Sequence, residues 1–137
     1  MNDVPFTEKA QYYDTLYHDK NYEAEIKYIK PFLRPNGLIA DFGCGTGEHL
    51  NTLSRNYQCV GFDLSPEMIA IARSKYPGLD FKVADICLIR GNCFSTIISL
   101  FHVINYQRSL EALKEFFDTC FLNLTTDGIV LFDFWNK

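Results

Sequence analysis

The sequence predicts an α/β protein built on a doubly wound parallel sheet, and two observations lead to that prediction. From residue 38 onward, short apolar runs typical of buried strands alternate with helix-like patterns. Such alternation is typical of a parallel sheet that helices cover on both faces. The first of these runs also leads directly into the glycine-rich turn Gly43-Cys-Gly-Thr-Gly47. Because ligands of parallel sheets bind at the carboxyl ends of the strands, this turn marks a candidate site.

The part of the chain before residue 36 is predicted to be helical. Aromatic and apolar residues recur at roughly helical spacing over residues 7–18 and again over residues 22–33. The breaker Pro35-Asn36-Gly37 should end the second of these helices. We therefore expect a helical segment over residues 1–35 and a sheet core over residues 36–137.

The core is predicted to contain five strands with helices between them. The expected strands are Leu38–Phe42, Tyr57–Phe62, Leu79–Val83, Ser95–Phe101 and Ile129–Phe134. The expected helices are Thr46–Arg55, Pro66–Lys75 with Ser65 as N-cap, and Leu110–Leu122, and Asp127-Gly128 is an expected turn. Right-handed crossovers place the strands in the order 3-2-1-4-5. The glycine turn and segment 99–106 should then face each other across one crevice.

Size and charge limit the classes of partner. The 137 residues fit one domain, and 47% hydrophobic residues can supply its core. The formal net charge of -4 leaves the chain as a whole without a basic surface for nucleic acid. No apolar run approaches the roughly 20 residues that span a bilayer. We therefore expect neither a nucleic-acid nor a membrane partner.

The cysteines indicate a reducing, cytoplasmic compartment. There are five of them, Cys44, Cys59, Cys87, Cys93 and Cys120, and no two form a C-x-x-C pair. An odd number in this arrangement favours neither a disulfide framework nor a zinc site, so no metal is expected. Cys59 and Cys120 lie in apolar runs and are expected to be buried thiols.

Acidic residues at the ends of the first two predicted strands indicate the kind of ligand. Asp41 lies two residues before the first glycine, where a carboxylate suits an ammonium group and repels a pyrophosphate. Asp63 ends the second strand, and an acid there can accept hydrogen bonds from both hydroxyls of a ribose. The alternative for Asp63 is a cap on the following helix, a role that Ser65 already fills.

A nicotinamide cofactor is disfavoured by the spacing of the glycines. Its fingerprint is G-x-G-x-x-G/A, whereas the turn here is tighter and Glu48 occupies the position of the third small residue. No Lys or Arg lies within residues 37–54 to meet a phosphate. A nicotinamide-dependent oxidoreductase is therefore the third of three hypotheses.

Taken together, the motifs resemble those of class I S-adenosylmethionine-dependent methyltransferases over about residues 36–135. The first motif of that family matches Asp41-Phe-Gly-Cys-Gly-Thr-Gly47, and the second matches Asp63 through Arg73 with Met68 in its helix. The third matches Ala84-Asp85-Ile86. The resemblance implies a Rossmann-like fold, S-adenosyl-L-methionine as cofactor and methyl transfer as the activity.

The resemblance also implies roles for single residues. Asp41 and the Gly43 backbone would hold the methionine amino group, and Asp63 would bind the ribose. Asp85 would bind the adenine amino group, with a solvated loop acid as the alternative, and the Ile86 N–H would meet a ring nitrogen. The adenine would lie between Leu64 and Met68. The full expected cofactor set is Tyr13, Asp41, Gly43, Cys44, Gly45, Thr46, Gly47, Asp63, Leu64, Met68, Asp85, Ile86, Leu100 and Phe101.

The N-terminal pattern around Tyr12-Tyr13-Asp14 is similar to a subgroup that contains amino-sugar N-methyltransferases. In that subgroup a tyrosine of the first helix caps the cofactor carboxylate, which makes Tyr13 the candidate here. A tyrosine that only packs is the open alternative. By this resemblance the segment over residues 1–35 would cover the cofactor.

Candidate catalytic residues follow the fourth predicted strand. Methyl transfer is an in-line displacement that needs alignment and exclusion of water, and an amine acceptor must be neutral. His102 and Tyr106 are the candidate catalytic residues, with shaping of the pocket as the alternative for His102. The subgroup's histidine falls near Tyr106 here, which weakens the case for a general base. Phe101 could face the sulfonium. His18 and His49 show no partner signal and are expected at the surface or in loops.

The family core has seven strands, and strands six and seven have no counterpart in these 137 residues. The fifth predicted strand would be an exposed apolar edge. We therefore expect either a fragment of a larger enzyme or a homodimer that pairs this edge. The leading hypothesis is methyl transfer to a small molecule, with an amine among the candidate acceptors. The second is a non-catalytic S-adenosylmethionine-binding module. The sequence leaves open the acceptor and whether N, O or C is methylated.

Overall fold

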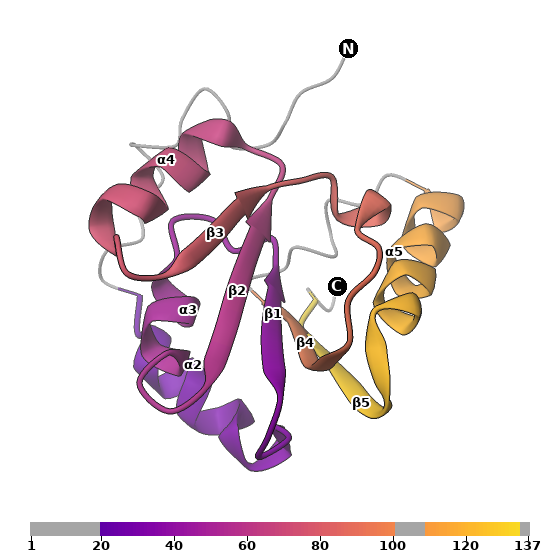
Figure 1. Cartoon of the computed structure of the whole chain (residues 1–137), viewed down its shortest axis with the longest axis horizontal. Coiled ribbons are helices and arrows are strands. Elements are labelled where there is room, and N and C mark those ends of the chain that lie inside the picture. The colour runs from indigo at the N-terminus through magenta and orange to yellow at the C-terminus, as the bar shows by residue number, and fades with distance from the viewer. Residues whose placement is uncertain (1–19, 101–108, 135–137) are drawn as a thin grey trace.

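The computed structural model describes residues 20–100 and 109–134. Its five strands are β1 (Leu38–Phe42), β2 (Gln58–Asp63), β3 (Asp80–Val83), β4 (Phe94–Ser99) and β5 (Leu124–Phe132). They form one sheet in the order β3-β2-β1-β4-β5, and every neighbouring pair is parallel (Figure 1). This arrangement confirms the predicted fold class and strand order.

The helices lie between the strands as predicted, with shifted ends. They are α2 (Tyr22–Ile29), α3 (Glu48–Leu53), α4 (Pro66–Lys75) and α5 (Leu110–Leu122), with 3₁₀ turns η2 (Lys30–Phe32) and η3 (Ile86–Leu88). The predicted helix over residues 22–33 changes to 3₁₀ geometry after Ile29, because Pro31 has no N–H to continue the α-helical bonds. The predicted helix over residues 7–18 lies outside the described residues.

Alternate residues of β1 divide the core into two faces. Ala40 and Phe42 pack on the face of α5, where Phe42 meets Phe116 edge-to-face with ring centroids 6.3 Å apart. Ile39 packs on the opposite face with residues of α2 and α3. Because residues two apart in a strand share a face, Asp41 lies on the same face as Ile39. Asp41 therefore lies on the sheet face that α2 and α3 cover.

The start of β5 differs from the prediction. Phe94 pairs with Leu124 and Thr96 with Ile129, so the residues between them on β5 form an irregularity within the strand. The Asp127-Gly128 pair was expected to form a separate turn before the strand. A Cβ on Gly128 would lie 2.9 Å from a methyl carbon of Leu124, which explains why the smallest residue occupies this close approach.

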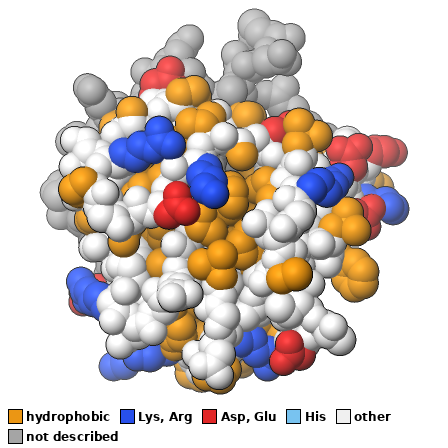
Figure 2. Space-filling model, viewed as in Figure 1, with side chains coloured by type: hydrophobic (Ala, Val, Ile, Leu, Met, Phe, Trp, Pro, Cys, Tyr) orange, Lys and Arg blue, Asp and Glu red, His pale blue; other side chains and the backbone are white. Residues whose placement is uncertain are grey.

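The five cysteines are all free thiols. Cys120 is buried as expected, whereas Cys59 is only partly buried. Within residues 20–100 and 109–134, no helix is long and apolar enough to cross a membrane. Figure 2 shows charged side chains of both signs spread over the face seen in Figure 1, with hydrophobic side chains visible between them. This face therefore carries no block of basic side chains.

Candidate functional site

The glycine turn after β1 takes a backbone course that other residues rarely adopt. Gly43, Gly45 and Gly47 have φ values of 84°, 56° and 89°. A Cβ on Gly47 would lie 2.6 Å from Cζ of Phe81, so the space there is already filled. The Gly43 N–H donates to the Phe62 carbonyl at 2.8 Å, which fastens the turn to β2. The three glycines are thus needed for the shape of the turn.

The carboxyl group of Asp41 is buried, and one of its oxygens has no hydrogen-bond donor among the described residues. The residue is only 1% exposed, and the oxygen without a donor is Oδ2. Burial raises the pKa of Asp41 to about 7, the charge of His49 opposes that rise, and the charge of Asp63 adds to it. A buried acceptor without a donor is costly, so the arrangement suits a ligand that brings a donor, above all a cation.

Asp63 lies at the carboxyl end of the adjacent strand and joins two loops. Its Oδ2 accepts from the Gly45 N–H at 2.8 Å, and its Oδ1 accepts from the Ser65 N–H at 2.9 Å. Burial raises the pKa of this carboxyl, and these backbone bonds oppose the rise. Ser65 caps α4 as predicted, because its Oγ accepts from the Met68 N–H at 3.2 Å. Asp63 therefore contacts the helix start as well, and a carboxylate, with about four acceptor sites, can still accept from a ligand.

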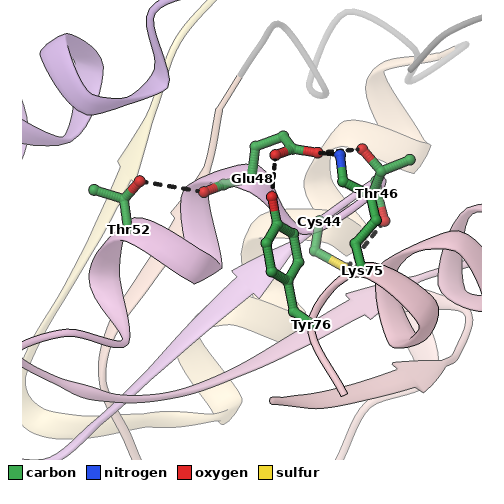
Figure 3. A network of polar contacts seen from close by, with 7 residues as sticks. Cys44, Thr46, Glu48, Thr52, Lys75 and Tyr76 are labelled. Atoms are coloured by element: carbon green, nitrogen blue, oxygen red, sulfur yellow. Dashed lines mark hydrogen bonds and ion pairs between the residues drawn. The ribbon is translucent and has the colours of Figure 1, made fainter. Parts of the chain in front are cut away.

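Glu48, which follows the glycine turn, accepts hydrogen bonds from several residues and so lies at the centre of a polar network (Figure 3). Its carboxylate accepts a 2.9 Å hydrogen bond from the Thr46 hydroxyl and further bonds from Lys75 and Tyr76. Lys75 and Tyr76 stand at the carboxyl end of α4. The network therefore ties the start of α3 to the end of α4, and it engages the hydroxyl of Thr46, one of the expected cofactor residues.

His49 is not at the surface, so the expectation for this residue was wrong. It is 6% exposed, and its Nε2 lies 3.3 Å from Oε1 of Glu25. The same Glu25 oxygen lies 2.9 Å from Nζ of Lys20, and the Tyr22 ring meets the His49 ring edge-on with centroids 4.9 Å apart. One signal in the sequence could have found Glu25, though not its partner. Glu25 falls at helical spacing with Tyr22 and Ile29, on the inner stripe of α2.

The four residues expected to contact the adenine differ in how far they are buried. Leu64 is 48% exposed beyond β2, whereas Met68 is completely buried in α4. Asp85 is exposed, and its Oδ1 accepts from the Cys87 N–H at 3.0 Å, which caps η3. Ile86 is the first residue of η3 and is partly buried. The adenine roles of these residues stay predictions.

Two further expected cofactor residues are buried. Cys44 is 7% exposed, and its backbone N–H donates to the Phe62 carbonyl at 2.9 Å. Leu100, which follows β4, is 6% exposed and packs in the cluster that contains Ile29 of α2. The remaining candidates, Tyr13, Phe101, His102 and Tyr106, lie outside the described residues.

A family model and several curated proteins match this chain. Residues 39–128 match the model described as a methyltransferase domain. The chain is 31% identical over 130 residues to a putative methyltransferase, YqeM, of Bacillus subtilis (strain 168), covering 90% of this chain and 53% of that protein. It is 28% identical over 134 residues to dTDP-3-amino-3,4,6-trideoxy-alpha-D-glucopyranose N,N-dimethyltransferase of Streptomyces venezuelae, covering 92% of this chain and 56% of that protein.

Solved structures share the fold. DesVI from Streptomyces venezuelae superposes with a TM-score of 0.81 at 27% identity, covering 98% of this chain and 58% of that one. The sugar N-methyltransferase KedS8 from Streptoalloteichus sp. ATCC 53650 gives 0.81 at 28% identity, covering 90% and 53%. The chain spans about half the length of the curated relatives described above.

Proposed function

The chain belongs to the methyltransferase domain family, and we propose that it transfers a methyl group from S-adenosyl-L-methionine to a small-molecule acceptor. The observation that carries the proposal is the carboxylate of Asp41. It is buried beside the glycine turn, and one of its oxygens has no hydrogen-bond donor among the described residues. The ammonium group at the amino-acid end of the cofactor is a donor of the right charge for that oxygen.

In this proposal, other described residues bind the ribose and the adenine of the cofactor. Asp63, at the end of β2, accepts from the ribose hydroxyls with the acceptor capacity that its backbone hydrogen bonds leave. Leu64 and Met68 pack against the adenine, and Asp85 and Ile86 meet its polar edge. The positive φ values of the glycine turn bring backbone, rather than a side chain, next to the ligand.

The chemistry needs little from the protein beyond placement. When bound, S-adenosyl-L-methionine supplies a methyl group on a positively charged sulfur, which a lone pair of the acceptor can displace. The chain's own residues hold both partners in line and keep water away. His102 and Tyr106, which follow β4 in sequence, are our candidates to receive a proton from the acceptor.

An amine is the acceptor group that we propose. The support comes from relatives whose names specify amino sugars as substrates, from Streptomyces venezuelae and from Streptomyces fradiae, at 28% and 30% identity. Glu48 argues against the nicotinamide alternative, because that fingerprint needs a small residue at this position, where the helix packs closely on the strand.

Transfer of labelled methyl groups tests this function. The chain is incubated with methyl-labelled S-adenosylmethionine and, in parallel, with an amino sugar nucleotide or its counterpart in which a hydroxyl replaces the amine. We expect label on the amino sugar alone. Label on both sugars would contradict the amine assignment. Cofactor binding without label on any acceptor would instead favour a non-catalytic binding module.

A further inference from the structure

We propose that His49, held by Glu25, is a positioning residue for the amino-acid end of the cofactor and acts through Asp41. The structure joins Lys20, Glu25 and His49 by ion-pair contacts, and a protonated His49 acts electrostatically on Asp41. The ligand's ammonium group would extend this row by one member. The inference rests on the proposed function, because it requires a ligand that carries this ammonium group. It adds a residue outside the expected cofactor set.

The first half of the row is fixed by short contacts. Lys20 Nζ lies 2.9 Å from Oε1 of Glu25, and His49 Nε2 lies 3.3 Å from the same oxygen. The side chain of His49 is 8% exposed and that of Glu25 is 32% exposed, so the pair is largely shielded from water. The Tyr22 ring packs edge-on against the imidazole. These contacts hold the imidazole between α2 and α3.

The second half of the row follows from the packing of α3 on the sheet face that carries Asp41. His49 and Leu53 are one turn apart in α3 and therefore share a helix face. Leu53 and Ile39 of β1 belong to one buried cluster, and Asp41 lies on the same sheet face as Ile39, two residues closer to the carboxyl end. Since α3 returns along β1 after the glycine turn, the step from Leu53 back to His49 parallels the step from Ile39 to Asp41. The imidazole thus lies over the Asp41 side of the sheet.

The charges along this row influence one another. Burial acts to raise the pKa of Glu25, but His49 and Lys20 outweigh it and bring that pKa down to about 2. For Asp41, burial raises the pKa to about 7, the charge of His49 opposes the rise, and Asp63 at the end of β2 adds to it. Among the described groups that act on Asp41, His49 is thus the one that favours the carboxylate.

Within residues 20–100 and 109–134, two thiols that interact with Asp41 stay neutral near pH 7. Burial raises the pKa of the Cys59 thiol, on β2, to about 11. Burial also raises the pKa of the Cys44 thiol, in the glycine turn, well above its ordinary value. Removing the charge of His49 should therefore leave Asp41 protonated up to a higher pH. A protonated Asp41 has lost the charge that attracts the ammonium group, so ligand affinity should fall in that pH range.

Calorimetric titration with two ligands tests this inference. S-adenosylhomocysteine carries the amino-acid end, and 5′-methylthioadenosine lacks it. In His49→Gln, which keeps an N–H donor without the charge, we expect S-adenosylhomocysteine to bind roughly tenfold more weakly at about pH 6.5, the effect of a pKa of Asp41 raised by about one. At about pH 8.5, where Asp41 is ionised in both proteins, the affinities should converge. Binding of 5′-methylthioadenosine should not change at either pH.

Two variants of α2 complete the test, Glu25→Gln as a second test variant and Glu23→Gln as the control. Glu25→Gln removes the partner of His49 from a partly exposed site, and it should shift the pH profile in the same direction by a smaller amount. Glu23 pairs with Arg55 at 2.8 Å and also joins α2 to the region of α3, but both side chains are exposed. Glu23→Gln should leave both affinities unchanged. Circular dichroism checks that each variant is folded.

The outcomes separate this inference from the proposed function. Equal weakening of both ligands in His49→Gln, or weakening that does not depend on pH, would mean that His49 only supports the structure. Unchanged profiles in folded His49→Gln and Glu25→Gln would also overturn the inference. In either case the cofactor site of the proposed function stands as long as the unmodified chain binds S-adenosylhomocysteine. If the unmodified chain binds neither ligand, the proposed function itself fails.

Discussion

At the scale of single residues, Asp41 is subject to opposing requirements of stability and binding. Its pKa in the folded chain is about 7, against an ordinary value of 3.8. Between these pH values the folded chain holds a proton that the unfolded chain has released, so the free energy of unfolding falls as pH rises through this range. Burial of the charged form is thus a cost that a bound cation would offset.

The variant Asp41→Asn removes this cost and should be more stable than the natural chain above about pH 7, by up to about 4 kcal/mol. Below the ordinary pKa of Asp, where the carboxyl is neutral in both the folded and the unfolded state, the two chains should differ little. Thermal unfolding across this pH range measures the effect. The same variant should lose affinity for S-adenosylhomocysteine. Lower stability at high pH, or unchanged affinity, would contradict the role given to Asp41.

Gly47 offers a second prediction at this scale. Its φ is 89°, and a Cβ would meet Phe81 at 2.6 Å. We expect Gly47→Ala to lower the free energy of unfolding by about 2 kcal/mol or more, because backbone strain and overpacking add. Gly78 is the matched control, since a Cβ on this residue would have nothing within 4 Å and its φ is not positive. Urea unfolding should show a clearly larger loss for Gly47→Ala than for Gly78→Ala, and equal losses would refute the explanation.

At the scale of elements, Glu48 connects the glycine turn and α3 to the end of α4. Because Tyr76 donates to its partly buried carboxylate, Tyr76→Phe and Glu48→Gln should be non-additive, with a coupling of about 1 kcal/mol. A double-mutant cycle in urea measures this coupling. The exposed ion pair of Lys114 and Asp118 on α5 is the control, and its coupling should be clearly smaller than that of the Glu48 pair. Couplings of equal size would mean that the Glu48 network adds nothing beyond a surface pair.

Several elements can be predicted from the sequence to within a residue or two. β1 and α5 match their expected bounds because their apolar patterns are regular and their ends carry breakers or caps. α2 does not, since Pro31 lies inside a pattern that otherwise continues. The irregular start of β5 depends on packing of Gly128 against Leu124, which local pattern does not contain.

Of the candidate site, too, one part can be predicted from the sequence and another part cannot. Asp41, Asp63 and the glycines lie where the strand order requires them, at neighbouring carboxyl ends. The pair of Glu25 and His49 joins residues 24 apart in sequence, and it depends on how α2 packs against α3. Helical periodicity assigns Glu25 to an inner face but does not identify its partner. Side-chain contacts between elements are therefore the part that the sequence left undetermined.

At the scale of the whole molecule, β5 pairs only with β4 among the described residues. Its side chains are mostly half-buried, and Phe132 is 40% exposed. An edge of this kind is a template for pairing with another strand. That strand is either a further strand of a larger enzyme or β5 of a second copy. For the 137-residue chain by itself we propose the second, and light scattering over a dilution series should give a molar mass that rises with concentration. A monomer at every concentration would contradict it.

The most direct test of the central claim, that the carboxyl ends of β1 and β2 bind S-adenosylmethionine, is calorimetric titration of the chain with S-adenosylhomocysteine. We predict micromolar binding, and at least tenfold weaker binding, about 1.4 kcal/mol, for Asp63→Ala. Circular dichroism shows whether each protein is folded. A folded chain that does not bind, or a folded Asp63→Ala variant with unchanged affinity, would contradict the claim.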